Sequence, residues 1–214
     1  MLPNLMRIAS LCLLVLMLGF CTPKSDDKSK LPVVDSLKAF PANQYVSADQ
    51  SPMDISYYPT DFPQHKLAGS PKAEMPVARV IYSRPHKKGR IIFSSSEKSL
   101  CHYGKPWRLG ANEATEIEFF VPVVIDGKNV SAGRYVLYCI PFADKWVIAL
   151  NSNIDSWGLA IDAGKDILRT EVPAQQQAPA LEDFTIVFAS ATYGADVIMA
   201  WDDVKTVLPL VFSH

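Results

Sequence analysis

The chain has 214 residues, of which 49% are hydrophobic and 20% are charged, and its formal net charge at pH 7 is -1. This composition is typical of one globular domain with additional segments. The nearly neutral charge provides no basic field that would attract nucleic-acid phosphates, so the composition argues against a nucleic-acid-binding protein.

The N-terminus has the pattern of a secretion signal. Arg7 precedes an apolar run from Ile8 to Phe20, which as a helix would rise only about 20 Å, short of the ~30 Å hydrocarbon core of a bilayer. We therefore interpret residues 1–20 as a signal peptide and not as a membrane span. The Leu-Gly-Phe-Cys order that ends at Cys21 resembles a bacterial lipobox, in which the cysteine becomes the lipid-carrying first residue of the mature protein.

These features predict a protein of the bacterial cell envelope that is anchored to a membrane through a lipid on Cys21. Its domain would face the periplasm or the cell surface. Ordinary cleavage near Cys21, with release of a soluble periplasmic protein, is the alternative.

Residues 21–68 are rich in Pro, Ser, Asp and Lys and lack a sustained strand or helix period. We interpret them as a lipid-anchored tether followed by an extended segment. The aromatic residues Tyr57, Tyr58 and Phe62 would pack this segment against the main domain, which we expect over residues 69–214.

The main domain is predicted to consist of short strands. Strands are expected at residues 77–82, 91–93, 116–125, 134–140, 145–151, 167–172, 183–189, 195–201 and 206–211. Asp126-Gly127 predicts a hairpin turn, and Pro122 indicates a sheet edge or a bulge. Frequent turns without a sustained helical period predict an all-β fold with little helix, either an antiparallel β-sandwich or a flattened barrel.

The most distinctive stretch is the loop of residues 103–115, which leads directly into the strand expected from residue 116. It reads Tyr-Gly-Lys-Pro-Trp-Arg-Leu-Gly-Ala-Asn-Glu-Ala-Thr and brings aromatic, basic, amide and acidic side chains together. Loops of this kind carry function more often than cores do. We therefore place the candidate site here.

The same loop carries a family resemblance. Its residues 107–115, together with Tyr82-Ser83-Arg84-Pro85, Lys88-Gly89-Arg90, Gly133-Arg134-Tyr135 and Trp157-Gly158, resemble the signature blocks of the Bacteroidota domain-of-unknown-function family numbered 2911. The resemblance covers roughly residues 69–210. It implies a secreted or lipid-anchored β-rich domain, and it implies no catalytic residues. Residues 90–103 depart from the usual pattern, so the geometry beside the loop is expected to differ.

The candidate ligand-binding residues are Arg84, Lys88, Arg90, Trp107, Arg108, Asn112, Glu113 and Thr115. Guanidinium groups bind carboxylate or sulfate through paired hydrogen bonds, and an indole stacks on the apolar side of a sugar ring. The basic residues would therefore form a cationic rim around Trp107, with Asn112 and Glu113 bonding sugar hydroxyls. In the alternative, Arg108 pairs with Glu113 to brace the loop, and Asn112 satisfies loop backbone groups.

Three functions are consistent with these residues. The first is an envelope lipoprotein that binds a small polar ligand, either a glycan or an organic anion. The second is a carbohydrate-active hydrolase or lyase with Glu113 as acid or base, which needs a second titratable group facing it. The third is a structural accessory subunit of an envelope complex. The sequence has no G-x-S-x-G elbow, phosphate-binding loop or zinc-ligand spacing, so we predict no enzyme class, cofactor or metal.

Two cysteines remain beyond the predicted signal peptide and the lipobox. Cys101 and Cys139 would meet an oxidising compartment, in which disulfides persist, so a bond between them is one possibility. In the other, Cys139 is a buried thiol within an apolar strand.

Overall fold

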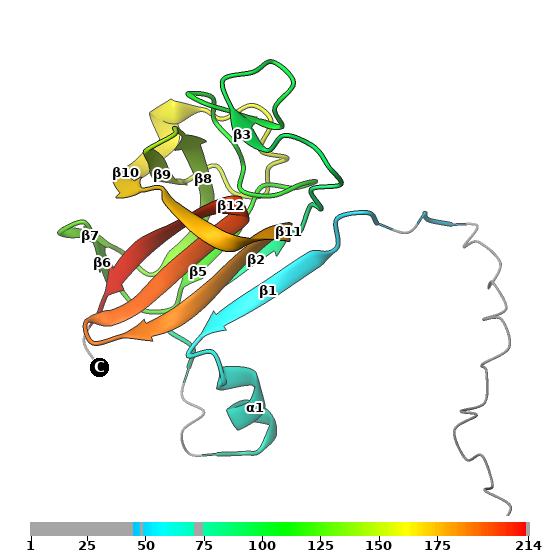
Figure 1. Ribbon diagram of the computed structural model, residues 1–214. Coiled ribbons are helices and arrows are strands. Elements are labelled where there is room, and N and C mark those ends of the chain that lie inside the picture. Colours follow the sequence, from blue (N-terminus) through cyan, green and yellow to red (C-terminus); the bar gives the residue numbers. More distant parts are fainter. Residues whose placement is uncertain (1–44, 48, 71–74, 213–214) are drawn as a thin grey trace, which may run out of the picture. The chain divides into compact units, whose positions relative to one another are not determined.

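Figure 1 shows a computed structural model of the chain, which describes residues 45–47, 49–70 and 75–212. The chain divides into two units, Met1–Val46 and Ser47–His214, and the account below concerns the second. The predicted signal peptide, Cys21 and most of the predicted tether lie outside the described residues. No helix among the described residues is long and apolar enough to span a bilayer.

Two antiparallel sheets make up most of the fold (Figure 1). The larger contains, in spatial order, β1 (Met53–Tyr58), β2 (Ala78–Ser83), β5 (Glu116–Phe119), β8 (Gly133–Pro141), β9 (Lys145–Asn151) and β10 (Asp166–Pro173). The smaller contains β11 (Gln175–Ala191), β12 (Gly194–Val211), β6 (Val123–Ile125) and β7 (Lys128–Val130). A short parallel pair, β3 (Phe93–Ser94) and β4 (Cys101–His102), lies beside them. The helical elements are α1 (Phe62–Leu67) and the 3-10 turn Ala163–Lys165. The predicted all-β sandwich is confirmed, and the sheets do not close into a barrel.

The core contains the alternating apolar residues of both sheets. Fully buried members include Ile117, Leu137, Ile148, Phe184, Ile186, Val197 and Met199. One part of the core is aromatic. Trp107 stacks on Trp201 with ring centroids 5.7 Å apart, and it meets Phe93, Trp146 and Phe184 edge-on at 4.8 to 6.0 Å. The loop of residues 103–115 is thus attached to the core through the aromatic contacts of Trp107.

The outer face of the larger sheet carries cross-strand ion pairs. Arg79 on β2 lies opposite Glu118 on β5, and their charged atoms are 2.6 Å apart, although the angle is not that of a hydrogen bond. Arg134 on β8 contacts Glu116 on β5 at 2.6 Å. Opposite charges on neighbouring strands stabilise a sheet and keep its outer face solvated. The arginines of this face therefore have their charges balanced.

The sheet begins earlier in the chain than residue 69, where we expected the main domain to start. β1 pairs with β2 along its whole length, from Met53 opposite Ser83 to Tyr58 opposite Ala78. Tyr58 is buried, and its hydroxyl donates a hydrogen bond of 3.0 Å to the carbonyl of Gly194. The extended segment thus provides the edge strand of the larger sheet.

Several predicted strand bounds are wrong. Of the strand expected at residues 91–93 only Phe93 is in a strand, and the strand expected at 183–189 is part of the longer β11. The strand expected over residues 116–125 is divided into β5 and β6, which belong to different sheets. Pro122 lies between them, where its missing N–H cannot continue a ladder. Conversely, the strands expected at 195–201 and 206–211 form the single strand β12. The hairpin turn at Asp126-Gly127 is confirmed, with φ values of 50° and 70° between β6 and β7.

Candidate functional site

Both ends of the loop are attached to β8. The backbone N–H and C=O of Trp107 pair with Cys139 at 2.7 and 2.9 Å. At the other end, the carbonyl of Thr115 accepts a bond of 2.8 Å from the N–H of Leu137. The buried Thr115 hydroxyl closes the loop by donating to the carbonyl of Leu109 at 2.6 Å. Thr115 is therefore a scaffold residue and not the ligand contact that the sequence suggested.

Two glycines allow the loop to approach its neighbours closely. A Cβ on Gly110 would lie 2.9 Å from the backbone oxygen of Ser83, at the end of β2. Gly158 has φ +73°, and a Cβ there would lie 2.9 Å from the Cβ of Ala114 and 3.0 Å from that of Arg108. Such contacts leave no space for a side chain. The Trp157-Gly158 segment therefore packs directly against the Cβ of Arg108.

Asn112 holds the segment that precedes β1. Its side-chain nitrogen donates to the two carboxylate oxygens of Asp49 at 3.1 and 3.3 Å and contacts the carbonyl of Ser51 at 3.4 Å. The Lys88 ammonium donates to the side chain of Gln50 at 3.3 Å. Asn112 and Lys88 thus bind a neighbouring part of the chain, and neither lines the cavity described below.

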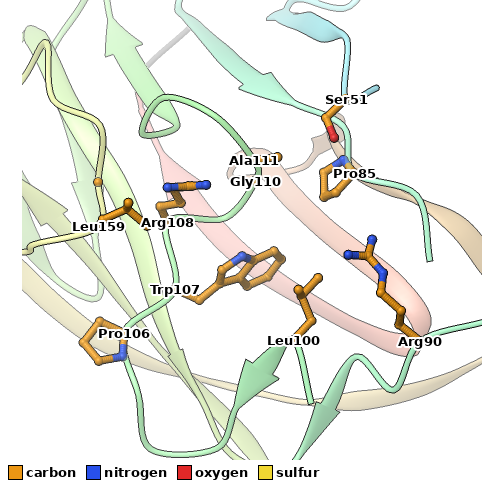
Figure 2. A pocket seen from close by; sticks show the side chains of 11 residues that line it. Ser51, Pro85, Arg90, Leu100, Pro106, Trp107, Arg108, Gly110, Ala111 and Leu159 are labelled. Carbon is orange, nitrogen blue, oxygen red and sulfur yellow. The ribbon is translucent and has the colours of Figure 1, made fainter. Parts of the chain in front are cut away.

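A cavity of about 370 Å³ lies beside the loop (Figure 2). It is lined by Ser51, Pro85, Arg90, Leu100, Pro106, Trp107, Arg108, Gly110, Ala111, Gly158 and Leu159. Its volume is within the range of pockets that bind small molecules. Figure 2 shows the indole of Trp107 between Arg108 and Arg90. The lining contains two guanidinium groups and no carboxylate, imidazole or thiol.

Arg90 and Arg108 differ from the other arginines of the described residues in their partners. The other four form ion pairs: Arg79 with Glu118, Arg84 with Asp54, Arg134 with Glu116 and Asp155, and Arg169 with Asp166. Arg90 and Arg108 have no carboxylate at ion-pair distance in that part of the chain, and both donate only to backbone carbonyls. Arg108 Nη1 bonds to Trp157 O at 3.2 Å, and Arg90 Nε bonds to Lys87 O at 3.0 Å. The cavity is thus lined by two guanidinium groups that form no ion pair within the described residues.

Burial also affects Arg108. It lowers the pKa of the guanidinium from its ordinary value, and the negative charge of Glu113 partly reverses this effect. Within the described residues Glu113 makes no ion pair with Arg108, and its side chain is exposed and outside the lining. The bracing pair that we considered from the sequence is therefore not formed.

The sequence identified three of the lining residues, namely Arg90, Trp107 and Arg108. Arg84 lies elsewhere, since it bonds to Asp54 at 3.2 Å. Lining residues that the sequence did not identify include Leu100, Pro106 and Leu159. Only the Trp157-Gly158 block, which forms part of the family resemblance, pointed to the segment that contributes Leu159.

Cys101 and Cys139 are free thiols, and both are buried. Burial raises the pKa of each thiol above its ordinary value. No group of three or more potential metal ligands gathers among the described residues. The candidate site is thus a cationic and partly apolar cavity.

These observations define a β-sandwich protein with a cationic cavity beside an anchored loop. The family model described as protein of unknown function (DUF2911) matches residues 67–210, more than half of the chain, and the chain belongs to this family. The matched range contains every lining residue of the cavity except Ser51. No curated protein and no solved structure matches the chain.

Proposed function

We propose that this protein binds a small organic anion in the cavity beside the Trp107 loop. One observation carries the proposal: the two arginines that line the cavity are the ones without a carboxylate partner among the described residues. Guanidinium groups that have no carboxylate partner attract anions, and the lining offers two of them. A carboxylate or sulfate fits the paired N–H groups of guanidinium and supplies the negative charge that the lining lacks.

The two competing functions have less support. A hydrolase or lyase that used Glu113 would need a second titratable group across the substrate. The cavity lining offers no such group besides the arginines, and Glu113 lies outside it. A loop that served only as a structural brace would pair Arg108 with Glu113, and the described residues contain no such ion pair.

We also propose that the protein is an envelope lipoprotein of the Bacteroidota type, anchored through Cys21. The apolar run from Ile8 to Phe20 and the cysteine that follows it support this location. Cys21→Ala should move the protein from the membrane fraction to the soluble fraction. Cys12→Ala, within the predicted signal peptide, is the matched control and should leave the protein in the membrane. Retention of the Cys21→Ala protein in the membrane would contradict the anchor.

The binding proposal is tested by thermal denaturation with a panel of anions, namely acetate, sulfate, cyclohexanecarboxylate and glucuronate. An anion at 100 times its Kd stabilises the folded state by about 2.7 kcal/mol. This should raise the melting temperature by roughly 5–11 °C for a domain of this size.

Matched arginine variants give the control. Arg90→Gln and Arg108→Gln should each reduce the anion-induced shift, whereas Arg134→Gln, whose residue is paired on the outer sheet face, should retain it. Equal shifts in all three variants would indicate a general salt effect. That result, or the absence of a shift with every anion, would contradict the proposal.

A further inference from the structure

The cavity has few neutral groups that can form hydrogen bonds. Among its lining side chains only the hydroxyl of Ser51 and the indole N–H of Trp107 are neutral hydrogen-bonding groups. The nearby amide of Asn112 is engaged by Asp49 and Ser51. A sugar carries a hydroxyl on most of its carbons, and each hydroxyl that loses water without gaining a partner weakens binding.

The remaining side chains of the lining are apolar. They are Pro85, Leu100, Pro106, Ala111, Leu159 and the ring of Trp107. Leu100 is 46% exposed and Leu159 is 76% exposed, although leucine side chains are usually buried. Exposed apolar side chains that gather at one opening mark a binding surface.

Two further exposed apolar residues are near Leu100 and Leu159 along the backbone, although neither belongs to the lining. The backbone N–H of Leu100 bonds to the carbonyl of Ile91 at 3.0 Å, and Ile91 is 52% exposed. Trp157, two residues before Leu159, is 54% exposed. The cavity thus combines two guanidinium groups that form no ion pair within the described residues with an apolar rim that includes Leu100 and Leu159 (Figure 2).

We infer that the anion bound here is a carboxylate attached to an apolar body, such as a ring or a branched hydrocarbon, and not a glycan. The inference rests on the proposed function, which supplies the anionic part. The carboxylate bonds to a guanidinium group of the lining, Arg108 or Arg90, and the hydrocarbon packs on Trp107, Leu100 and Leu159. Binding then covers the apolar rim and places one negative charge beside the two guanidinium groups.

The test is a calorimetric titration of the full chain with two anions of equal charge and similar shape. Cyclohexanecarboxylate and glucuronate each place one carboxylate on a six-membered ring, and they differ chiefly in hydroxyl groups. Cyclohexanecarboxylate should bind about tenfold more tightly than glucuronate, and also more tightly than acetate, which lacks the ring. Glucuronate binding equally or more tightly would overturn the inference and leave the proposed function intact. Failure of all these anions and of sulfate to bind would contradict the proposed function itself.

A matched pair of leucine variants tests the rim. Leu159→Ser should weaken cyclohexanecarboxylate binding by roughly three- to tenfold and leave acetate binding unchanged. Leu67→Ser is the control, because Leu67 is a 91% exposed residue of α1 outside the cavity, and it should change neither affinity. If Leu159→Ser instead lowered the oligomeric mass in sedimentation and left both affinities unchanged, the rim would be an interface between copies of the chain, and the inference would be wrong.

Discussion

Thr115 and Arg108 lie in the same loop, and we expect their substitutions to have opposite effects. Thr115→Val removes a hydroxyl and nearly conserves volume. The carbonyl of Leu109, in a residue with no exposed surface, would lose its 2.6 Å hydrogen bond. A buried acceptor left without a partner costs about 1–3 kcal/mol. At roughly 2–4 °C per kcal/mol, a central value of about 2 kcal/mol lowers the melting temperature by about 4–8 °C.

Arg108→Gln should leave the melting temperature nearly unchanged. Arg108 has no carboxylate partner among the described residues, and its bond to the carbonyl of Trp157 faces a cavity that water can fill. Substitutions of this kind usually change stability by no more than about 0.5 kcal/mol.

Thermal denaturation by circular dichroism measures both variants without ligand, and titration with cyclohexanecarboxylate then measures anion affinity. We expect Thr115→Val to lose stability and Arg108→Gln to lose affinity. If Arg108→Gln lost as much stability as Thr115→Val and kept its anion affinity, the loop would be a scaffold, and the reasoning about its charges would be refuted.

Three further predictions concern the loop support, the thiols and the alkaline limit of stability. Gly158→Ala should destabilise by more than Gly127→Ala. Both glycines have positive φ, but an added Cβ would be 2.9 Å from Ala114 at Gly158 and would have no neighbour within 4 Å at Gly127. Equal melting temperatures of the two variants would contradict the close packing at Gly158. Alkylation and peptide mapping of denatured, unreduced protein should find both Cys101 and Cys139 modified, and a peptide that joins the two would show that they are bonded. Burial raises the pKa of Tyr82 from 10.0 to about 12, so the unfolded state loses this proton first; the contribution of Tyr82 to stability should be fully present below about pH 10 and be lost as the pH rises towards 12. Ionisation of Tyr82 near pH 10 in the folded protein, measured by ultraviolet difference absorbance against Tyr82→Phe, would contradict this.

The strand pattern could be predicted from the sequence because the two faces of each sheet have different environments. In β9 the buried Trp146 and Ile148 alternate with the partly exposed Lys145 and Val147, and the predicted bounds of this strand are those observed. The break at Pro122 was harder to place, because a proline within an apolar run is consistent with a bulge as well as with a change of sheet. The role of β1 was not predicted, because an edge strand that reads Met-Asp-Ile-Ser-Tyr-Tyr is too polar to resemble a core strand.

The site was predicted only in part, because tertiary contacts determine which arginines pair with a carboxylate and which line the cavity. From sequence, Arg84 and Arg90 are equivalent members of one basic segment. The fold places Asp54, thirty residues earlier in the chain, against Arg84 and leaves Arg90 beside the cavity. The apolar lining is likewise assembled from separate segments, so Leu100 and Leu159 carry no local signal of their proximity to Trp107. Loop composition located the region, and only the fold could show which side chains face the cavity.

The most direct test of anion binding is to observe the arginine side chains themselves. In a protein labelled with ¹⁵N at arginine, the Nε–H resonances of Arg90 and Arg108 should shift progressively on addition of cyclohexanecarboxylate, with assignments made from Arg90→Gln and Arg108→Gln. The resonances of Arg79 and Arg134, which are paired with carboxylates on the outer sheet face, should remain unchanged. Shifts confined to Arg79 and Arg134, or no shift of any arginine at saturating anion, would contradict the claim that the cavity beside Trp107 is an anion-binding site.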